Sequence, residues 1–344
     1  MKLVDLASPD VAHAHLSWPW MAFDVGGRRF AFSTSERHIA TRLLRNGAIA
    51  EGSSFSLEDD LTVRAFTLDS SGTVLAALAT DAAVVASGAS SPGDDGTIVV
   101  TLDATEAAKE AGAAPRRSSI DPLVGHGFAA KAIAFDRSGT RLWISAESRT
   151  ETAVALVDAR THDLLGIVRS AAFPPPSMHE LMLHPNEDAV LLLAACGEDG
   201  TFARVATWRG DRLQAVPTAL DDGSIPAGFV GFSSDGARVH LAEADELRTH
   251  AWPGLEELSS VEFADDFVSS FAGAVLGDRI FVDGEDSEAR EDAVMIFDAS
   301  ALRGHLASPP VPAGMWAGRL GADTIVTVES KGEPARARVI RIAE

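Results

Sequence analysis

The chain contains no tyrosine and only one cysteine, Cys196, in 344 residues. A single cysteine excludes an internal disulfide and a zinc site built from cysteine ligands, and it suits a reducing compartment. The apolar residues around Cys196 favour a buried, inert thiol over a nucleophile. The lack of tyrosine removes a residue type that interaction surfaces favour, and nothing in the composition explains it.

Long apolar runs are also missing. No stretch approaches the length that a membrane span requires. The first residues carry Asp5 and no apolar segment of the kind found in secretory signals. We therefore expect a cytoplasmic protein.

Positive charge is scarce, with 29 Lys and Arg residues against 50 Asp and Glu residues and a net charge of −21. The largest basic cluster is the pair Arg116 and Arg117. Nucleic acids and anionic membranes are therefore unsuitable partners, and a basic protein surface or a cation fits better. Solubility alone is the simpler explanation of the acidic excess.

What the chain does contain is a recurring phrase of two apolar strands joined by a tight turn. The clear copies lie at 20–33, 65–78, 132–145 and 230–242. Looser copies lie at 181–195, 272–283 and 317–328. Self-similarity at a fixed period indicates a repeat fold.

The spacing of these turns predicts a propeller. The turn residues are Gly26, Gly72, Gly139, Asp188, Gly236, Gly277 and Gly321, separated by 46, 67, 49, 48, 41 and 44 residues. A four-stranded blade takes roughly 40–50 residues, and the long interval contains a flexible insertion at 81–96 that is rich in Ala, Ser, Gly and Asp.

We therefore expect one all-β domain over 1–344, a seven-bladed β-propeller with four-stranded antiparallel blades. The expected blades span about 12–58, 59–122, 123–173, 174–222, 223–264, 265–310 and 311–344. Residues 1–9 are expected to complete the last blade as its outer strand and so to close the ring, because that copy offers only three strands.

In three of the expected blades the third strand ends in an Asp followed by a small residue, namely at Asp103, Asp158 and Asp298. Such an Asp caps the backbone amides that follow it, so we assign these residues structural roles. The phrases Phe135-Asp-Arg-Ser-Gly-Thr-Arg-Leu-Trp-Ile and Ala153-Val-Ala-Leu-Val-Asp-Ala-Arg-Thr resemble WD40/YVTN propeller repeats. Gly125-His126 and Val157-Asp158 are similar to the Gly-His and Trp-Asp dipeptides of that family, and the resemblance implies a structural role for His126. The resemblance implies a β-propeller fold and indicates almost nothing about activity.

Acidic residues recur where the second strands are expected to end, which would place them on one face of the propeller. They are Glu36, Asp81, Glu147, Glu198, Asp199, Glu243, Asp245, Glu285, Asp286 and Glu329. We expect them to form an acidic rim that docks a basic protein partner, with Trp20 and Trp252 as candidate anchors. Ordinary solvated loop acids and tryptophans packed between blades are the alternatives.

Catalytic motifs are scarce, and we lean towards a non-enzymatic scaffold that is itself monomeric and has no cofactor and no metal. One alternative is a sugar-lactone hydrolase without calcium, with His179 and Glu180 as its candidate catalytic residues. The chain has only Asn46 and Asn186 as asparagines, both expected on the far face, so the calcium site of propeller lactonases cannot form. A sensor that binds a small ligand or peptide in the central channel is the second alternative.

Overall fold

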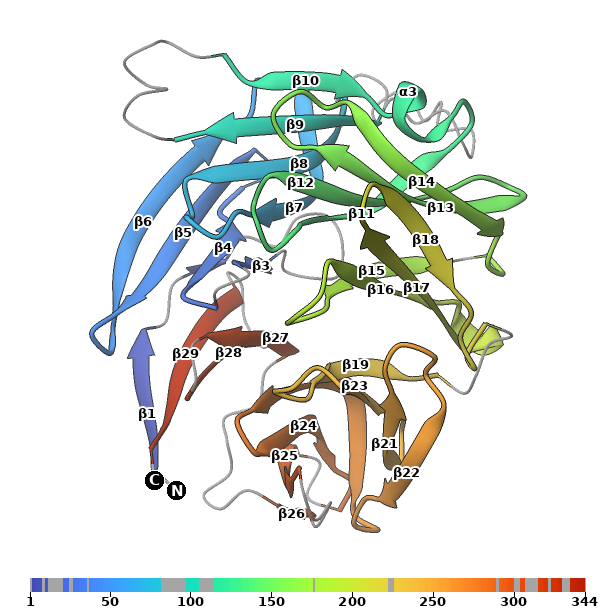
Figure 1. Ribbon diagram of the computed structural model, residues 1–344. Helices are drawn as coiled ribbons and strands as arrows, with labels where there is room; N and C mark the ends of the chain where they lie inside the picture. Colours follow the sequence, from blue (N-terminus) through green and yellow to red (C-terminus); the bar gives the residue numbers. More distant parts are fainter. Residues whose placement is uncertain are drawn as a thin grey trace.

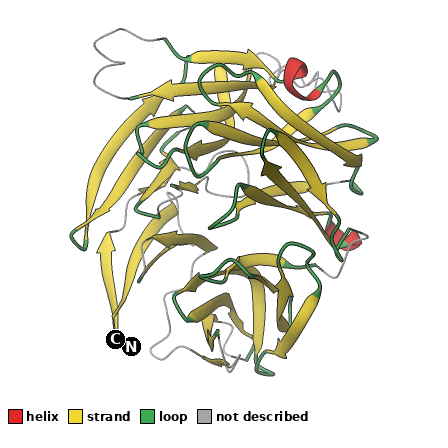
Figure 2. Ribbon diagram, viewed as in Figure 1, coloured by secondary structure: helices red, strands yellow, loops and turns green. Residues whose placement is uncertain are grey.

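The repeated hairpins form β-strands in the computed structural model. The structure describes residues 2–7, 10–11, 21–24, 27–35, 37–81, 97–104, 114–175, 177–221, 226–288, 291–299, 304–306, 315–320, 323–329 and 335–343. Six four-stranded antiparallel sheets follow one another along the chain and fan out around a centre, as the blades of a propeller (Figure 1). Strands dominate the described part of the fold, with α3 (Asp121–Val124) and the 3-10 turn η1 (Gly197–Asp199) between them (Figure 2).

We number the blades in chain order. The first blade contains β3 (Met21–Phe23), β4 (Arg29–Ser33), β5 (His38–Arg45) and β6 (Ala48–Ser56). The second contains β7 (Leu61–Leu68), β8 (Val74–Asp81), β9 (Thr97–Asp103) and β10 (Arg116–Ser119). The third contains β11 (Ala129–Phe135), β12 (Arg141–Glu147), β13 (Glu151–Asp158) and β14 (Leu164–Ala171).

The other three blades have the same order. The fourth contains β15 (Met178–Leu183), β16 (Ala189–Ala195), β17 (Thr201–Arg209) and β18 (Arg212–Val216). The fifth contains β19 (Gly228–Phe232), β20 (Arg238–Ala242), β21 (Glu246–Ala251) and β22 (Glu257–Glu262). The sixth contains β23 (Phe267–Leu276), β24 (Arg279–Asp286), β25 (Glu291–Asp298) and β26 (Gly304–Leu306).

A buried acceptor holds the turn between the first two strands of most blades. In the third blade one carboxylate oxygen of Asp136 accepts the backbone N–H groups of Thr140 and Arg141 at 3.1 and 3.0 Å. Gly139 provides the positive φ of +70° that this turn requires. Asp69 accepts two amides in the same way in the second blade, and the ring of His184 does so in the fourth.

The core lies between the blades. Apolar clusters fill each seam between successive blades, for example Val190 and Leu192 of the fourth blade against Trp143 and Leu156 of the third. Each strand therefore buries side chains on both of its faces, and this explains the nearly continuous apolar sequences of the second strands.

The predicted fold class needs a correction, because the described residues form six such blades and not seven. The remaining sheet, which we call the terminal sheet, contains five strands: β27 (Met315–Leu320), β28 (Thr324–Glu329), β29 (Ala335–Ala343), β1 (Lys2–Ala7) and β2 (Asp10–Val11). It packs against the first blade through Val326 and Val339 and against the sixth through Ile325 and Ile340.

Closure by one N-terminal strand was also wrong in the form predicted. β29 has nine residues, and β1 pairs only with its second half, from Val339 to Ala343. The pairing of β1 is irregular between Asp5 and Ala7, and the separate strand β2 pairs with Ala335 and Arg336. A single six-residue strand is too short to cover β29, so two segments share its edge.

The single-domain organisation and the blade boundaries stay predictions. The predicted insertion at 81–96 lies, apart from Asp81, outside the described residues. Within the part of the chain that the structure describes, no helix is long and apolar enough to cross a membrane.

Candidate interaction surface

The predicted rim acids stand at one end of the blades. Their positions are the ends of β8, β12, β24 and β28 (Asp81, Glu147, Glu285, Asp286, Glu329), the turn η1 (Glu198, Asp199) and the turn after β20 (Glu243, Asp245). Glu36 lies outside the described residues, as do the side chains of Asp81 and Glu329. The innermost strands begin at this same end, because the first two strands of each blade are antiparallel.

Two of these acids point into the protein. The side chain of Glu147 is 11% exposed and that of Glu243 is 3% exposed, whereas Glu198, Asp199, Asp245 and Glu285 are exposed. The structure therefore does not bring the predicted acids together as one continuous exposed rim.

The negative charge is concentrated in the fifth and sixth blades. Residues 243–298 contain sixteen acidic and three basic side chains, although they make up about a sixth of the chain. These blades are the yellow-orange and orange strands at the bottom of Figure 1.

Backbone hydrogen bonds join three acidic loops of these two blades. The N–H of Phe263 donates to the carbonyl of Asp245 at 2.7 Å, and the N–H of Ser287 donates to the carbonyl of Asp266 at 2.6 Å. The loops therefore form one continuous patch, which we call the acidic surface. Its members are Asp245, Glu246, Glu262, Asp265, Asp266, Glu285, Asp286 and Glu288.

Like charges face each other within this surface. Glu246 on β21 is the cross-strand partner of Glu262 on β22, an arrangement that costs stability in an antiparallel sheet. Val268, which is 47% exposed, is the cross-strand partner of Glu285. The surface thus combines unfavourable acid pairing with an exposed apolar side chain.

Arg248 holds the inner edge of the acidic surface together. Its guanidinium lies 3.0 Å from Glu243, 2.5 Å from Glu246 and 3.0 Å from Glu257. Burial raises the pKa of the Glu243 carboxyl, and Arg248 opposes that rise.

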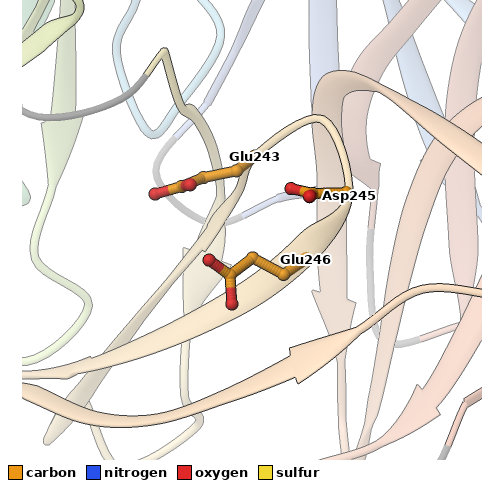
Figure 3. A group of neighbouring side chains, drawn as sticks. All are labelled: Glu243, Asp245 and Glu246. Atoms are coloured by element: carbon orange, nitrogen blue, oxygen red, sulfur yellow. The ribbon is translucent and has the colours of Figure 1, made fainter.

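Glu243, Asp245 and Glu246 can place one carboxylate oxygen each within 4.8 Å of the others (Figure 3). Among the described residues, these three have the arrangement that most resembles a cation site. The arginine already supplies a positive charge to two of the three carboxylates, so these residues do not require a metal.

A second polar cluster lies between the third and fourth blades. The ring of His179 is fully buried, with Nδ1 3.3 Å from the hydroxyl of Ser145 and Nε2 3.8 Å from a carboxylate oxygen of Glu147. The hydroxyl of Ser177 donates to that same oxygen. Burial lowers the pKa of His179 to about 3, helped by the positive charges of Lys131 and Arg204. The ring is therefore neutral at neutral pH.

The candidate catalytic pair is separated by the strand that carries it. His179 faces the third blade, whereas Glu180 lies on the same side of β15 as Met182, which packs towards the fifth blade. Successive side chains of a strand point to opposite faces. His179 and Glu180 therefore cannot act on one bond.

The candidate tryptophan anchor Trp252 does not join the acidic surface. Trp252 follows β21 at the end of the blade opposite to Asp245, and its ring stacks on His184 with centroids 4.7 Å apart. Its contacts with His184 and Phe232 place it in the seam between the fourth and fifth blades. Trp20 lies outside the described residues.

The predicted structural residues differ in their surroundings. One carboxylate oxygen of Asp158 accepts the N–H groups of Thr161 at 2.7 Å and Arg160 at 2.9 Å, and these bonds, the one from Thr161 first, lower its pKa. Asp103 and Asp298 end β9 and β25 and are exposed. The side chain of His126 is 83% exposed and has Nδ1 3.2 Å from a carboxylate oxygen of Asp121, and its structural role stays a prediction.

Sequence reasoning missed three features. It did not single out Arg248 or the acids of 262–266, although a count of charge per blade would have found the second. It also missed His162, a buried residue with a positive φ of 59° that bridges Thr101 and Ser118 of the second blade at 2.8 and 2.9 Å. No sequence pattern marks that histidine.

Comparison with known proteins adds no family to this description. No family model matches the chain, and no curated protein is similar to it in sequence. The fold itself defines the class, an all-β propeller.

Proposed function

We propose that this propeller is a non-enzymatic interaction scaffold that docks a basic protein partner on its acidic surface. The observation that carries the proposal is the concentration of acidic side chains on the joined loops of the fifth and sixth blades. A large field of one sign attracts a partner of the opposite sign and orients its approach.

The pairing of Glu246 with Glu262 supports the same proposal. Arg248 already neutralises Glu246, whereas Glu262 beside it on the neighbouring strand makes like charge with Glu246 that a lysine or arginine of a partner would offset. Local arrangements that cost stability are expected where a protein binds something. Val268 would supply apolar contact beside the charges.

Several finer assignments belong to this proposal. They are a repeat of WD40/YVTN type, a cytoplasmic location and a propeller that is monomeric apart from its partner. The fold is compatible with each of them. The hydrolase alternative loses its candidate pair, because His179 and Glu180 lie on opposite faces of β15.

The test measures binding of a fluorescently labelled octalysine peptide to the full chain. Glu262→Gln, Asp265→Asn and Asp266→Asn together should weaken binding about tenfold or more, since each removes a close opposite charge. The matched control, Asp163→Asn with Glu187→Gln and Asp211→Asn, changes the net charge equally at exposed acids elsewhere and should change the affinity less than about twofold. Equal losses in both variants would show attraction by net charge alone and would contradict a defined docking surface.

A further inference from the structure

The outer strand of the sixth blade covers only part of its neighbour. β25 has eight residues, but β26 pairs only with the three from Met295 to Phe297. β26 itself has three residues and is the shortest outer strand of the six blades. Within the described part of the chain, no residue pairs with the outer side of β25 between Glu291 and Val294. The start of β25 is therefore an open sheet edge among these residues.

The register of β25 shows which backbone groups face this edge. In an antiparallel pair every second residue exchanges hydrogen bonds with one neighbouring strand, and the residues between them face the other side. The N–H of Ala299 donates to the carbonyl of Asp278 at 2.7 Å, and the pairing of β25 with β24 continues from there without a bulge. Ala293, six residues before Ala299, therefore bonds to β24. Asp292 and Val294 consequently direct their N–H and C=O groups outward.

The sequence after β26 cannot supply the partner that Asp292 lacks. Residues 307–314 lie outside the described residues, but a continued register of β26 would bring Pro309 opposite Asp292. Proline has no N–H, and a sheet edge tolerates it only where its nitrogen faces away from the neighbouring strand. The fourth blade differs here, because the hydroxyl of Thr218, beyond its outer strand, donates to the carbonyl of Ala203 at 2.9 Å.

The charge at this edge selects what can pair with it. Glu291 and Asp292 begin β25, and the cross-strand partner of Glu291 is Asp286 of the acidic surface. An incoming strand therefore meets negative charge, which lysine or arginine offsets. A second copy of the chain is unsuitable, because antiparallel pairing of β25 with itself would set Asp298 of one copy opposite Glu291 of the other.

We propose that the start of β25 takes up an extended basic peptide of the partner as an added strand. This inference rests on the proposed docking function and specifies how the partner binds. The peptide backbone pairs with the outward N–H and C=O groups of Asp292 and Val294, as in other cases where a strand is added to an open sheet edge. Lysine or arginine side chains of the peptide lie beside the acids of β25 and of the adjoining acidic surface.

Two substitutions of Asp292 in the full chain test the added strand. Asp292→Pro removes the outward N–H that the peptide needs and leaves the hydrogen bonds between β25 and β24 in place. Asp292→Asn is the matched control, because both substitutions remove the same charge. In titrations with the labelled octalysine peptide, Asp292→Pro should bind about fivefold more weakly than Asp292→Asn, the effect of one lost hydrogen bond. Equal affinities of the two variants would overturn the proposal.

A measurement on the unaltered chain does not depend on how Asp292→Pro folds. Hydrogen exchange at the amides of Asp292 and Val294 should slow when octalysine binds, and unchanged exchange there would overturn the proposal. If the triple variant of the acidic surface loses affinity while the two Asp292 variants bind equally, strand addition fails and the docking function stands. A dimer of the free chain that Asp292→Pro abolishes would assign the edge to a second copy and would also overturn the proposal.

Discussion

Arg248 shows at the residue scale how this acidic protein tolerates buried charge. Its guanidinium contacts three carboxylates, of which Glu243 is almost fully buried. A buried carboxylate without its cation is far more costly than one that keeps it.

Arg248→Met should therefore lower the free energy of unfolding by about 2 kcal/mol at neutral pH, less than for a fully buried pair because the guanidinium is partly exposed. The loss should shrink as the pH falls, because the raised pKa of Glu243 lets it take up a proton early and become neutral. Urea unfolding at pH 7 and pH 5 measures both effects. Arg212→Met, in a solvated pair with Asp211, should change stability by less than about 0.5 kcal/mol.

Buried histidines give the protein a pH dependence at the same scale. The pKa of His162 is lowered to about 4, first by burial and then by the charge of Arg116. His179 and His240 have pKa values lowered to about 3 and about 4, first by burial. As the pH falls from about 6.5 to about 4, these histidines take up protons in the unfolded chain but not in the folded one, so folding loses stability.

His162→Asn should remove one such contribution, because asparagine also tolerates a positive φ. At pH 7 the variant should be about 2 kcal/mol less stable than the parent through the lost hydrogen bonds to Thr101 and Ser118. At pH 5 that difference should shrink by about 2 kcal/mol, since one pKa unit corresponds to about 1.4 kcal/mol. Urea unfolding at both values measures it, and a difference that does not change with pH would refute the role of His162.

At the scale of elements, the first hairpin of most blades is stabilised within its own turn, and the third blade shows how. Asp136 is 1% exposed, accepts two backbone amides and pairs with Arg141 at 2.7 Å. Arg141 also reaches Asp188 of the fourth blade at 2.8 Å, so this turn connects two blades.

Asp136→Ala should cost about 3 kcal/mol, because it leaves the amides of Thr140 and Arg141 without their acceptor and weakens an ion pair. Thermal unfolding measures the loss. Asp163→Ala, at an exposed turn of the same blade, is the control and should stay within about 0.5 kcal/mol. A similar effect of both substitutions would show that the buried acceptor is not what holds the turn.

The hairpins were predictable because their determinants are local. Phe135, Asp136 and Gly139 lie within five residues, and their order alone specifies strand, turn acceptor and positive φ. The terminal sheet was mispredicted because its pairing is not local. Asp10 pairs with Arg336 across nearly the whole chain, and no nearby pattern shows that β2 exists or that β29 needs two partners.

The whole molecule is a ring of thin sheets whose faces are apolar and whose charge is unevenly distributed. The end-of-strand position of the predicted acids could be deduced from the repeat, but their burial could not. Glu147 turns inward because His179 and Ser177 meet it there, and Glu243 does so because Arg248 meets it. The local charge of the sequence shows that the fifth and sixth blades carry the acidic surface. Only the tertiary hydrogen bonds show which of their loops are joined.

Hydrogen–deuterium exchange of the full chain with and without the octalysine peptide tests the docking surface most directly, because it maps where a basic ligand rests. The account predicts slower exchange at the joined acidic loops, residues 243–247, 262–269 and 284–288, and little change on the first three blades. Protection located mainly on other blades, or bound peptide that protects none of these loops, would contradict it.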